Sequence, residues 1–263
     1  MPALAALAEG PNANDAPTTA GTAVKPMKSL LLADDRLDLL ATLEPILKHW
    51  GYRVLTATNV AQVSAFLAAS NPVLLLIGSN LLNAPELDLP HPPLPLLALA
   101  HVEAPPPHRQ PDMTLDVPID IFALFSFIQS RVEHHPRQNL RLAVRLPGMY
   151  RLKGKEFVLA DVLSLSMHGL FCRSPLRLAA GDRVSAVFPL LGSGREIEVE
   201  GTVLYTIEPA VENNYLQGFA MAFDPLDAEQ TSLLGRFIEE RLLADVSACQ
   251  TGVGTFSAAR LRR

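Results

Sequence analysis

The chain has 263 residues, of which 49% are hydrophobic, and this length and composition can fill the cores of two ordinary domains. A formal net charge of −5 argues against a general nucleic-acid-binding protein, which needs a broad basic face. The two cysteines, Cys172 and Cys249, offer neither a disulfide framework nor metal-ligand spacing, and Cys172 is expected to be a small buried residue. No apolar stretch reaches the roughly 18–20 residues that a membrane span needs.

The first 27 residues are rich in Ala, Pro, Thr and Asn. They lack a charged start and contain only a short apolar run, so they do not have the pattern of a signal peptide. We expect residues 1–27 to form a disordered tail and the protein to be cytoplasmic.

Residues 28–133 alternate short apolar runs with helical patterns. Helical spacing is found at residues 36–52, 59–70 and 120–133, with Asn59 and Asp120 as expected N-caps. The segment "HVEAPPPHRQP" is too rich in proline for a normal helix. Continuous apolar strands separated by helices predict an α/β domain with a doubly wound parallel sheet covered on both faces. The expected strands are "SLLLAD", "RVLTAT", "PVLLLIG", "LPLLALA" and "MTLDVPI".

The pattern changes after residue 134. Six short strand patterns follow, separated by Gly and Asn turn signals, and a helical pattern at residues 227–242 comes last, with Asp227 as its cap. Six antiparallel strands of this length predict a small β-barrel followed by a C-terminal helix. The expected organisation is therefore an α/β domain at 28–133, a barrel domain at 134–243 and a flexible tail at 244–263. His134, His135 and Pro136 interrupt the preceding helix at the boundary.

The first domain resembles the receiver domain of response regulators, through its strand–helix order and the acid pair Asp34 and Asp35 after the first strand. The resemblance implies a magnesium-binding acid pair, a phosphoryl-accepting aspartate after the third strand and a lysine after the fifth. Here Gly78 stands in place of the acceptor, Val117 in place of the lysine, and Ala100 where receivers usually carry Ser or Thr. We therefore expect a pseudo-receiver without phosphotransfer, which docks on a partner protein or on a second copy.

Two interpretations of the surviving acid pair are open. In the first, Asp34 and Asp35 still bind magnesium as a vestigial site. In the second, which we favour, they form a solvated turn that caps the first helix. No other metal site is expected, since His134 and His135 have no third ligand-type residue nearby.

A basic segment enters the barrel domain, with six Lys and Arg residues and no acid between positions 137 and 155. Within it, "RQNLR" places Arg137 and Arg141 four residues apart, and "SLSMHG" then places Ser164, Ser166 and Gly169 on a strand and turn. These motifs resemble those of the PilZ domain, RxxxR and [DN]xSxxG, although Ser164 replaces the family's acid or amide. That family is known as a receptor for the bacterial messenger cyclic di-GMP, so the resemblance implies a cyclic di-GMP site at these five residues.

The chemistry of these residue types suits that ligand. Cyclic di-GMP carries two phosphodiester charges and two guanines, and a guanidinium can bond guanine O6 and N7 together or stack on a base face. We expect Ser166 to offer a hydroxyl and Gly169 to let the backbone approach the ligand. Ser164 should make one hydrogen bond where Asp or Asn would make two, at a cost of about 1 kcal/mol.

Two further residues are candidates for ligand contacts. Arg141 and Arg145 form a second RxxxR pair one step inside the strand, and His168 lies between the motif residues. We prefer Arg137 and Arg141 as the binding pair, because "LAVRLP" then falls where the first barrel strand of the family begins. His168 is equally well explained as a solvent-facing turn residue.

The expected function is that of a non-enzymatic effector without a cofactor. It would transmit the cyclic di-GMP level to a protein partner, or act by self-association, through the receiver-like domain, without binding DNA or inserting into a membrane. The alternative is a PilZ-fold adaptor that has lost the nucleotide and acts only by protein contacts. An enzyme is not expected, because the barrel half has no clustered His, Asp and Glu and no recognisable Ser-His-Asp arrangement.

Overall fold

A computed structural model describes residues 27–90, 93–100 and 109–249. The described chain divides into two compact units. Residues 27–140 and 239–249 belong to the first unit, and residues 141–238 form the second. The division after Leu140 lies seven residues beyond the boundary expected at position 133, so the segment that carries Arg137 belongs to the first unit.

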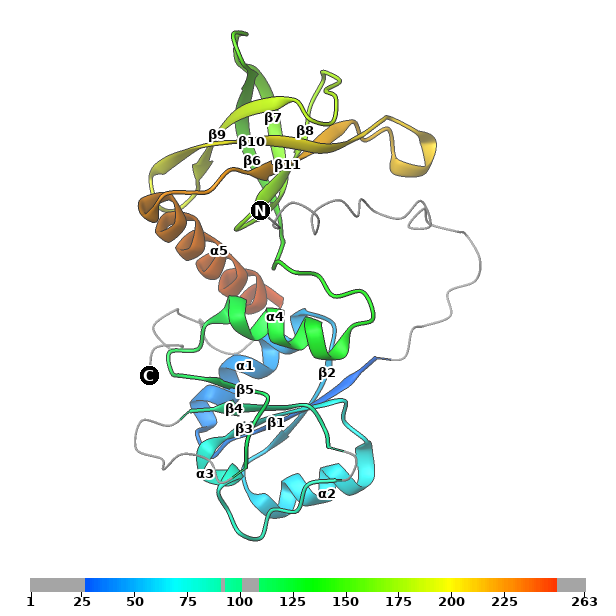
Figure 1. The fold of residues 1–263 in the computed structure, drawn as a ribbon, viewed down its shortest axis with the longest axis vertical. Coiled ribbons are helices and arrows are strands. Elements are labelled where there is room, and N and C mark those ends of the chain that lie inside the picture. The colour runs from blue at the N-terminus through cyan, green and yellow to red at the C-terminus, as the bar shows by residue number, and fades with distance from the viewer. Residues whose placement is uncertain (1–26, 91–92, 101–108, 250–263) are drawn as a thin grey trace, which may run out of the picture. The chain divides into compact units, whose positions relative to one another are not determined.

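The first unit contains a parallel five-stranded sheet in the order β2-β1-β3-β4-β5 (Figure 1). This is the strand order of doubly wound folds of the flavodoxin type, in which ligands bind outside the carboxyl ends of the strands. The central strands β1 and β3 are buried on both faces, which explains their unbroken apolar sequences. The sheet comprises β1 (Ser29–Ala33), β2 (Arg53–Ala57), β3 (Leu74–Gly78), β4 (Leu96–Leu99) and β5 (Met113–Leu115).

Helices cover both faces of this sheet, with α1 and α4 on one side and α2 on the other (Figure 1). The Asn59 side chain accepts a hydrogen bond from the backbone N–H of Gln62, and that of Asp120 accepts from Phe122 and Ala123. Both predicted N-caps are therefore confirmed. The helices are α1 (Leu37–His49), α2 (Val60–Ser70), the short α3 (Ser79–Leu82) and α4 (Ile121–Val132).

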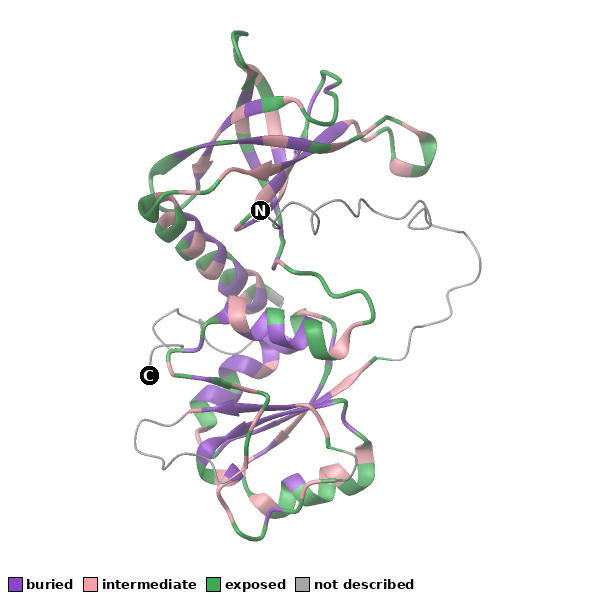
Figure 2. Cartoon of the chain, in the orientation of Figure 1, coloured by how far each residue is buried: buried purple, intermediate pink, exposed green. Residues whose placement is uncertain are grey.

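The second unit is a closed six-stranded barrel, in the order β10-β11-β8-β7-β6-β9, as predicted. Buried and exposed residues alternate along its strands, whereas β1 and β3 of the sheet are buried continuously (Figure 2). Tyr150 and Phe219 meet edge to face in the barrel core, with ring centroids 5.0 Å apart. The strands are β6 (Leu142–Leu152), β7 (Val158–Ser166), β8 (Gly169–Arg173), β9 (Arg183–Leu190), β10 (Arg195–Ile207) and β11 (Gly218–Phe223), with a short 3-10 helix, η1 (Val211–Asn213), before β11.

The last helix, α5 (Ala228–Cys249), follows the barrel. Asp227 caps it as predicted, because its carboxylate accepts a hydrogen bond from the backbone N–H of Gln230 at 2.7 Å. The helix continues six residues past position 243, where a flexible tail was expected to begin, so that prediction was wrong for residues 244–249. Leu242, Leu243 and Val246 are buried, and burial of apolar residues at this helical spacing accounts for the extension.

The rest of the two predicted tails, residues 1–26 and 250–263, lies outside the described residues. None of the helices in the described part of the chain is long and apolar enough to cross a bilayer.

Candidate functional site

The acid pair of the receiver-like unit does not form a pair in space. Asp34 follows β1 and is fully buried, and both of its carboxylate oxygens are bound by the side chain of Arg36. Arg36 Nε donates to Asp34 Oδ1 and Nη2 donates to Oδ2, each at 2.8 Å. The remaining guanidinium nitrogen, Nη1, donates to the carbonyl of Ala100 at 3.1 Å. One guanidinium therefore joins the carboxyl ends of β1 and β4.

The solvated-turn interpretation is wrong for Asp34. It does not lie in a solvated turn, and the positive charge beside it comes from Arg36, whose pKa is raised by the hydrogen bonds to this carboxylate. Asp35 is exposed and accepts a hydrogen bond from Asn80 Nδ2 at 2.9 Å, which lowers the pKa of Asp35. A magnesium ion at this position would have to displace Arg36 from a buried, bidentate ion pair.

The structure also explains the glycine at the phosphoryl-acceptor position. Gly78 ends β3, directly beside the Asp34 carboxylate. A Cβ atom built on Gly78 would lie 2.5 Å from Asp34 Oδ2, closer than real Cβ contacts allow. The Asp34–Arg36 pair therefore occupies the space that an acceptor side chain would need, and β3 ends without one.

Three of the four arginines in the basic segment have exposed side chains, and the fourth, Arg151, pairs with Glu198. Arg137, Arg141 and Arg145 are exposed, and their side chains have no acidic partner within the described part of the chain. Most other arginines of the barrel are paired, for example Arg173 with Asp161. Unpaired guanidinium groups on an acidic protein are the feature expected of a site for an anion.

Arg137 is held to the first unit through its backbone. Its N–H donates to Gln129 Oε1 at 3.0 Å, and Gln129 Nε2 donates to the Tyr52 hydroxyl at 3.1 Å. Gln129 is buried, and Tyr52 OH donates onward to Glu133 at 3.2 Å. Burial and the neighbouring Glu133 carboxylate raise the pKa of Tyr52. The network fixes the backbone of Arg137, a few residues after the end of α4, while the side chain of Arg137 stays exposed.

Arg141, Arg145 and Ser164 share one outer face of the barrel. Ala143 of β6 pairs directly with Ser164 of β7, and directly opposed residues point to the same side of a sheet. Arg141 and Arg145 flank Ala143 at two-residue spacing, and all three are exposed. The alternation of exposed and buried residues therefore sets Arg141 and Arg145 on the same face as Ser164, and it makes Arg145 a candidate alongside Arg141.

A β-bulge adjoins Ser164. The pairing of β7 with β8 shifts register between Val162 and Ser164, and the pairing of β6 with β7 shifts between Ala143 and Leu146. Bulges bend a strand and redirect its side chains, and they are common beside binding sites. Ser164 is half-buried, so part of its surface stays available on this outer face.

Ser166 has a structural role in addition to the ligand contact expected of it, which stays a prediction. It is buried, and its hydroxyl donates to the carbonyl of Gly169 at 3.0 Å and accepts from the backbone N–H of His168 at 3.3 Å. The hydroxyl thus holds the two-residue turn between β7 and β8 together. These two bonds use the O–H donor and one of the two acceptor lone pairs, so a ligand that donates a hydrogen bond can still reach Ser166 while the turn stays intact.

Gly169 is also explained by the barrel. A Cβ atom at this position would lie 2.4 Å from the backbone oxygen of Met221 on the paired strand β11. The glycine therefore permits close approach of two strands, and the approach of its backbone to a ligand stays a prediction. His168 is exposed in the turn, as one of the two interpretations held. Cys172 is buried as predicted, and burial raises the pKa of its thiol to about 12.

No metal site emerges from the side chains that the structure describes. They contain no group of three or more His, Cys, Asp and Glu residues placed to hold an ion. His134 and His135 are exposed and follow the end of α4.

The barrel half matches a known domain family. The family model of the PilZ domain matches residues 135–240, which confirms the resemblance found in the sequence. The five-stranded parallel sheet confirms the receiver-like fold class of the other half. A comparison with curated proteins finds no match.

Several solved structures are similar to parts of this chain. The inhibitor of motility MotI/DgrA from Bacillus subtilis is 17% identical, covers 42% of this chain and 52% of its own, and has a TM-score of 0.37. The K. pneumonia MrkH–c-di-GMP complex is 17% identical, covers 43% of this chain and 56% of its own, with a TM-score of 0.39. The signal receiver domain of an HD domain-containing protein from Pseudomonas fluorescens Pf-5 is 20% identical. The match covers 41% of this chain and 96% of that domain, with a TM-score of 0.35. The chain thus spans about half the length of the first two proteins.

Proposed function

Because residues 135–240 match the PilZ domain, we propose that this chain is a cytoplasmic, non-enzymatic effector that binds cyclic di-GMP at its barrel. The observation that supports this best is the outer face on which Arg141 and Arg145 flank the position opposite Ser164. Among the described residues, no acid is bound to either arginine. The ligand of the family carries two negative charges, and unpaired guanidinium groups can neutralise and hydrogen-bond them.

Isothermal titration calorimetry of the full chain with cyclic di-GMP tests this proposal, with chromatography of the nucleotide after the titration. Saturable binding with intact nucleotide supports the effector function. Absence of binding would favour the alternative of a PilZ-fold adaptor that acts only by protein contacts. Appearance of a hydrolysis product would contradict the non-enzymatic assignment.

We further propose that the receiver-like unit transmits the signal to a protein partner without being phosphorylated. Arg137 offers a route, because its side chain faces solvent near the ligand-binding motif in sequence while its backbone is bound to Gln129 of α4. Ligand contacts to the Arg137 side chain would favour one position of this backbone, and Gln129 would carry the change to Tyr52. The signal would then enter the receiver-like unit from its C-terminal end and would need no phosphoryl group.

Treatment with acetyl phosphate should leave the chain unmodified, and the Gly78→Asp variant should not gain phosphorylation. The new side chain would meet the Asp34 carboxylate at once, since a Cβ at position 78 lies 2.5 Å from its Oδ2. Val117 supplies no cation to hold a product phosphate, whereas receivers use a lysine there. Intact-mass measurement after incubation with magnesium and acetyl phosphate checks both forms. A stable phosphoryl adduct on residues 28–133 of the unaltered chain would refute the proposal.

Ser164→Asn should tighten cyclic di-GMP binding by about 1 kcal/mol, or roughly fivefold, because an amide can pair with a guanine edge at two points where a hydroxyl makes one bond. The position is half-buried on the outer face beside the bulge. Ser232→Asn is a matched control, since Ser232 is exposed on α5 and belongs to neither motif. If calorimetry finds no gain, or a loss, for position 164, its side chain does not face the ligand.

A further inference from the structure

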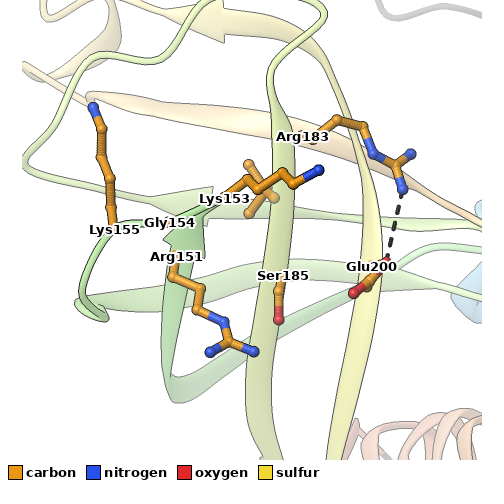
Figure 3. Close-up of a pocket in the computed structure, with 8 residues that line it drawn as sticks. Arg151, Lys153, Gly154, Lys155, Arg183, Ser185 and Glu200 are labelled. Atoms are coloured by element: carbon orange, nitrogen blue, oxygen red, sulfur yellow. Dashed lines mark ion pairs between the residues drawn. The ribbon is translucent and has the colours of Figure 1, made fainter.

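A hollow of about 530 Å³ lies on the barrel, and none of its lining residues belongs to the RxxxR or SxxG motifs. Its size falls within the range of small-molecule sites. Four of the residues that line it are cations and one is an acid (Figure 3). The cations are Arg151, Lys153, Lys155 and Arg183, and the acid is Glu200.

The register of β6 with β9 places two of these cations, Lys153 and Arg183, opposite each other. Leu152 at the end of β6 pairs with Val184 of β9, so the next residue, Lys153, stands at the position opposite Arg183. Figure 3 shows the Lys153 side chain reaching across β9 towards Arg183. Like charges directly opposed across two strands destabilise a sheet unless another charge offsets them. The arrangement places the ammonium of Lys153 and the guanidinium of Arg183 on one side of the sheet, where both can reach the same anion.

A second row of side chains forms the adjoining part of the hollow. Arg151 pairs with Ser185 across β6 and β9, and Ser185 pairs with Glu200 across β9 and β10. These residues are two positions along their strands from Lys153 and Arg183, so both rows face the same side of the sheet. An anion bound by Lys153 and Arg183 would thus lie within one strand pleat of Arg151.

Nearby acids already engage the two arginines but not the lysine. Arg183 is bound to Asp224 and lies 3.8 Å from Glu200, and Arg151 lies 3.3 Å from Glu198. All of these pairs are exposed, and exposed ion pairs contribute only about 0–1 kcal/mol. An incoming anion can therefore share the two guanidinium groups at small cost. Lys153 has no hydrogen-bond or ion-pair partner in the described part of the chain.

We propose that this hollow is a second anion site, which takes a phosphate group with more than one negative charge. Three of the cations that line it can be reached together by one anion with several oxygens: the ammonium of Lys153, which is unpaired among the described residues, and the guanidinium groups of Arg151 and Arg183. A phosphate monoester or a pyrophosphate carries about two charges or more at pH 7, together with oxygens that match the fork of an arginine and the point charge of a lysine. A soluble phosphate ester and a lipid headgroup are two sources of this chemistry.

Calorimetry of the full chain with pyrophosphate, in the presence of saturating cyclic di-GMP, tests the proposal for a soluble source. Lys153→Gln should weaken pyrophosphate binding about tenfold or more, the loss expected for one charged hydrogen bond. Lys155→Gln is the matched control, because Lys155 points away from Lys153 and Arg183 in Figure 3 and should change binding less than about twofold. Neither lysine belongs to the cyclic di-GMP motifs, so cyclic di-GMP affinity should be unchanged in both variants.

Co-sedimentation with phosphatidic acid vesicles, whose headgroup is a phosphate monoester, compared with phosphatidylcholine vesicles alone, tests the lipid source. Binding that needs phosphatidic acid and is lost in Lys153→Gln, without pyrophosphate binding, would assign the site to a lipid headgroup. The proposal is overturned if neither probe binds. It is also overturned if Lys153→Gln and Lys155→Gln lose the same amount of pyrophosphate affinity, or if citrate binds as tightly as pyrophosphate. Because cyclic di-GMP binding is measured separately on the same samples, failure of this site and failure of the effector function are distinguishable.

Discussion

Replacing Arg36 with alanine should lower the free energy of unfolding of the receiver-like unit by about 3 kcal/mol, the lower end of the range for breaking a buried ion pair. The carboxylate of Asp34 is fully buried and receives two side-chain hydrogen bonds from Arg36, while the Arg36 side chain is 23% exposed. Removing the guanidinium leaves the carboxylate in a low-dielectric environment with one backbone hydrogen bond, from the N–H of residue 36. The hydrogen bond to Ala100 that ties β1 to β4 is lost as well.

Denaturation of the full chain in urea, followed by tryptophan fluorescence, measures this effect. Trp50 is the only tryptophan of the sequence, and it packs edge to face on Phe125 of α4 at 5.1 Å, so it reports on the receiver-like unit. The double variant Asp34→Ala with Arg36→Ala is the control, because it removes the buried charge together with its partner and should be more stable than Arg36→Ala alone. A loss below about 1 kcal/mol in the single variant would contradict the stabilising role of the pair.

The fold was largely predictable from local patterns. The unbroken apolar runs at β1 and β3 can only be buried on both faces, and the alternating runs after residue 141 can only be buried on one. The caps Asn59, Asp120 and Asp227 were identified because a capping side chain acts within three residues of its own position. The predicted tail from residue 244 failed because composition says little about burial, and three apolar residues of α5 at helical spacing are buried.

The chemistry of the acid pair was not predictable in the same way. The sequence "ADDR" shows the Arg36 cation two residues from Asp34, and this spacing was the available signal for an ion pair between them. Its meaning depends on the carbonyl of Ala100, which is 64 positions away and arrives only when β4 pairs with β3. The glycine at position 78 predicted that phosphotransfer is lost. The structure adds that the Asp34–Arg36 ion pair occupies the space beside this glycine.

The candidate ligand site shows a similar division. The arginine motif was visible from spacing alone, whereas the pairing of Ala143 with Ser164 on the same outer face depends on the register of β6 with β7. The hydrogen bonds of Ser166 to the turn could not be predicted, because partners made by folding are invisible in a linear pattern. Gly169 owes its lack of a side chain to Met221, which comes from a strand about 50 residues later.

Arg141→Ala should weaken cyclic di-GMP binding by about 2 kcal/mol, or roughly thirtyfold, because a charged hydrogen-bonding partner is lost. Arg137→Ala should cost a similar amount, and the double variant about 4 kcal/mol if the two contacts are independent. The fold should survive, since both side chains are exposed and neither forms an ion pair with the described residues. Calorimetry of the full chain at fixed salt concentration gives the affinities. Arg177→Ala is the control for the loss of one exposed arginine. Arg177 lies outside both motifs, and it pairs with Glu208 at 3.4 Å.

The same series decides which RxxxR pair binds the ligand. Arg141 belongs to both pairs, so its removal should weaken binding whichever pair is used, while Arg137 and Arg145 belong to one pair each. We expect the larger loss at Arg137, whose backbone Gln129 anchors, and a smaller loss at Arg145, which lies on the outer face but further along β6. A large loss at Arg145 with none at Arg137 would move the site onto the barrel strand and remove the proposed route through Gln129. Unchanged affinity at both Arg137 and Arg141 would exclude the cyclic di-GMP site as it is placed here.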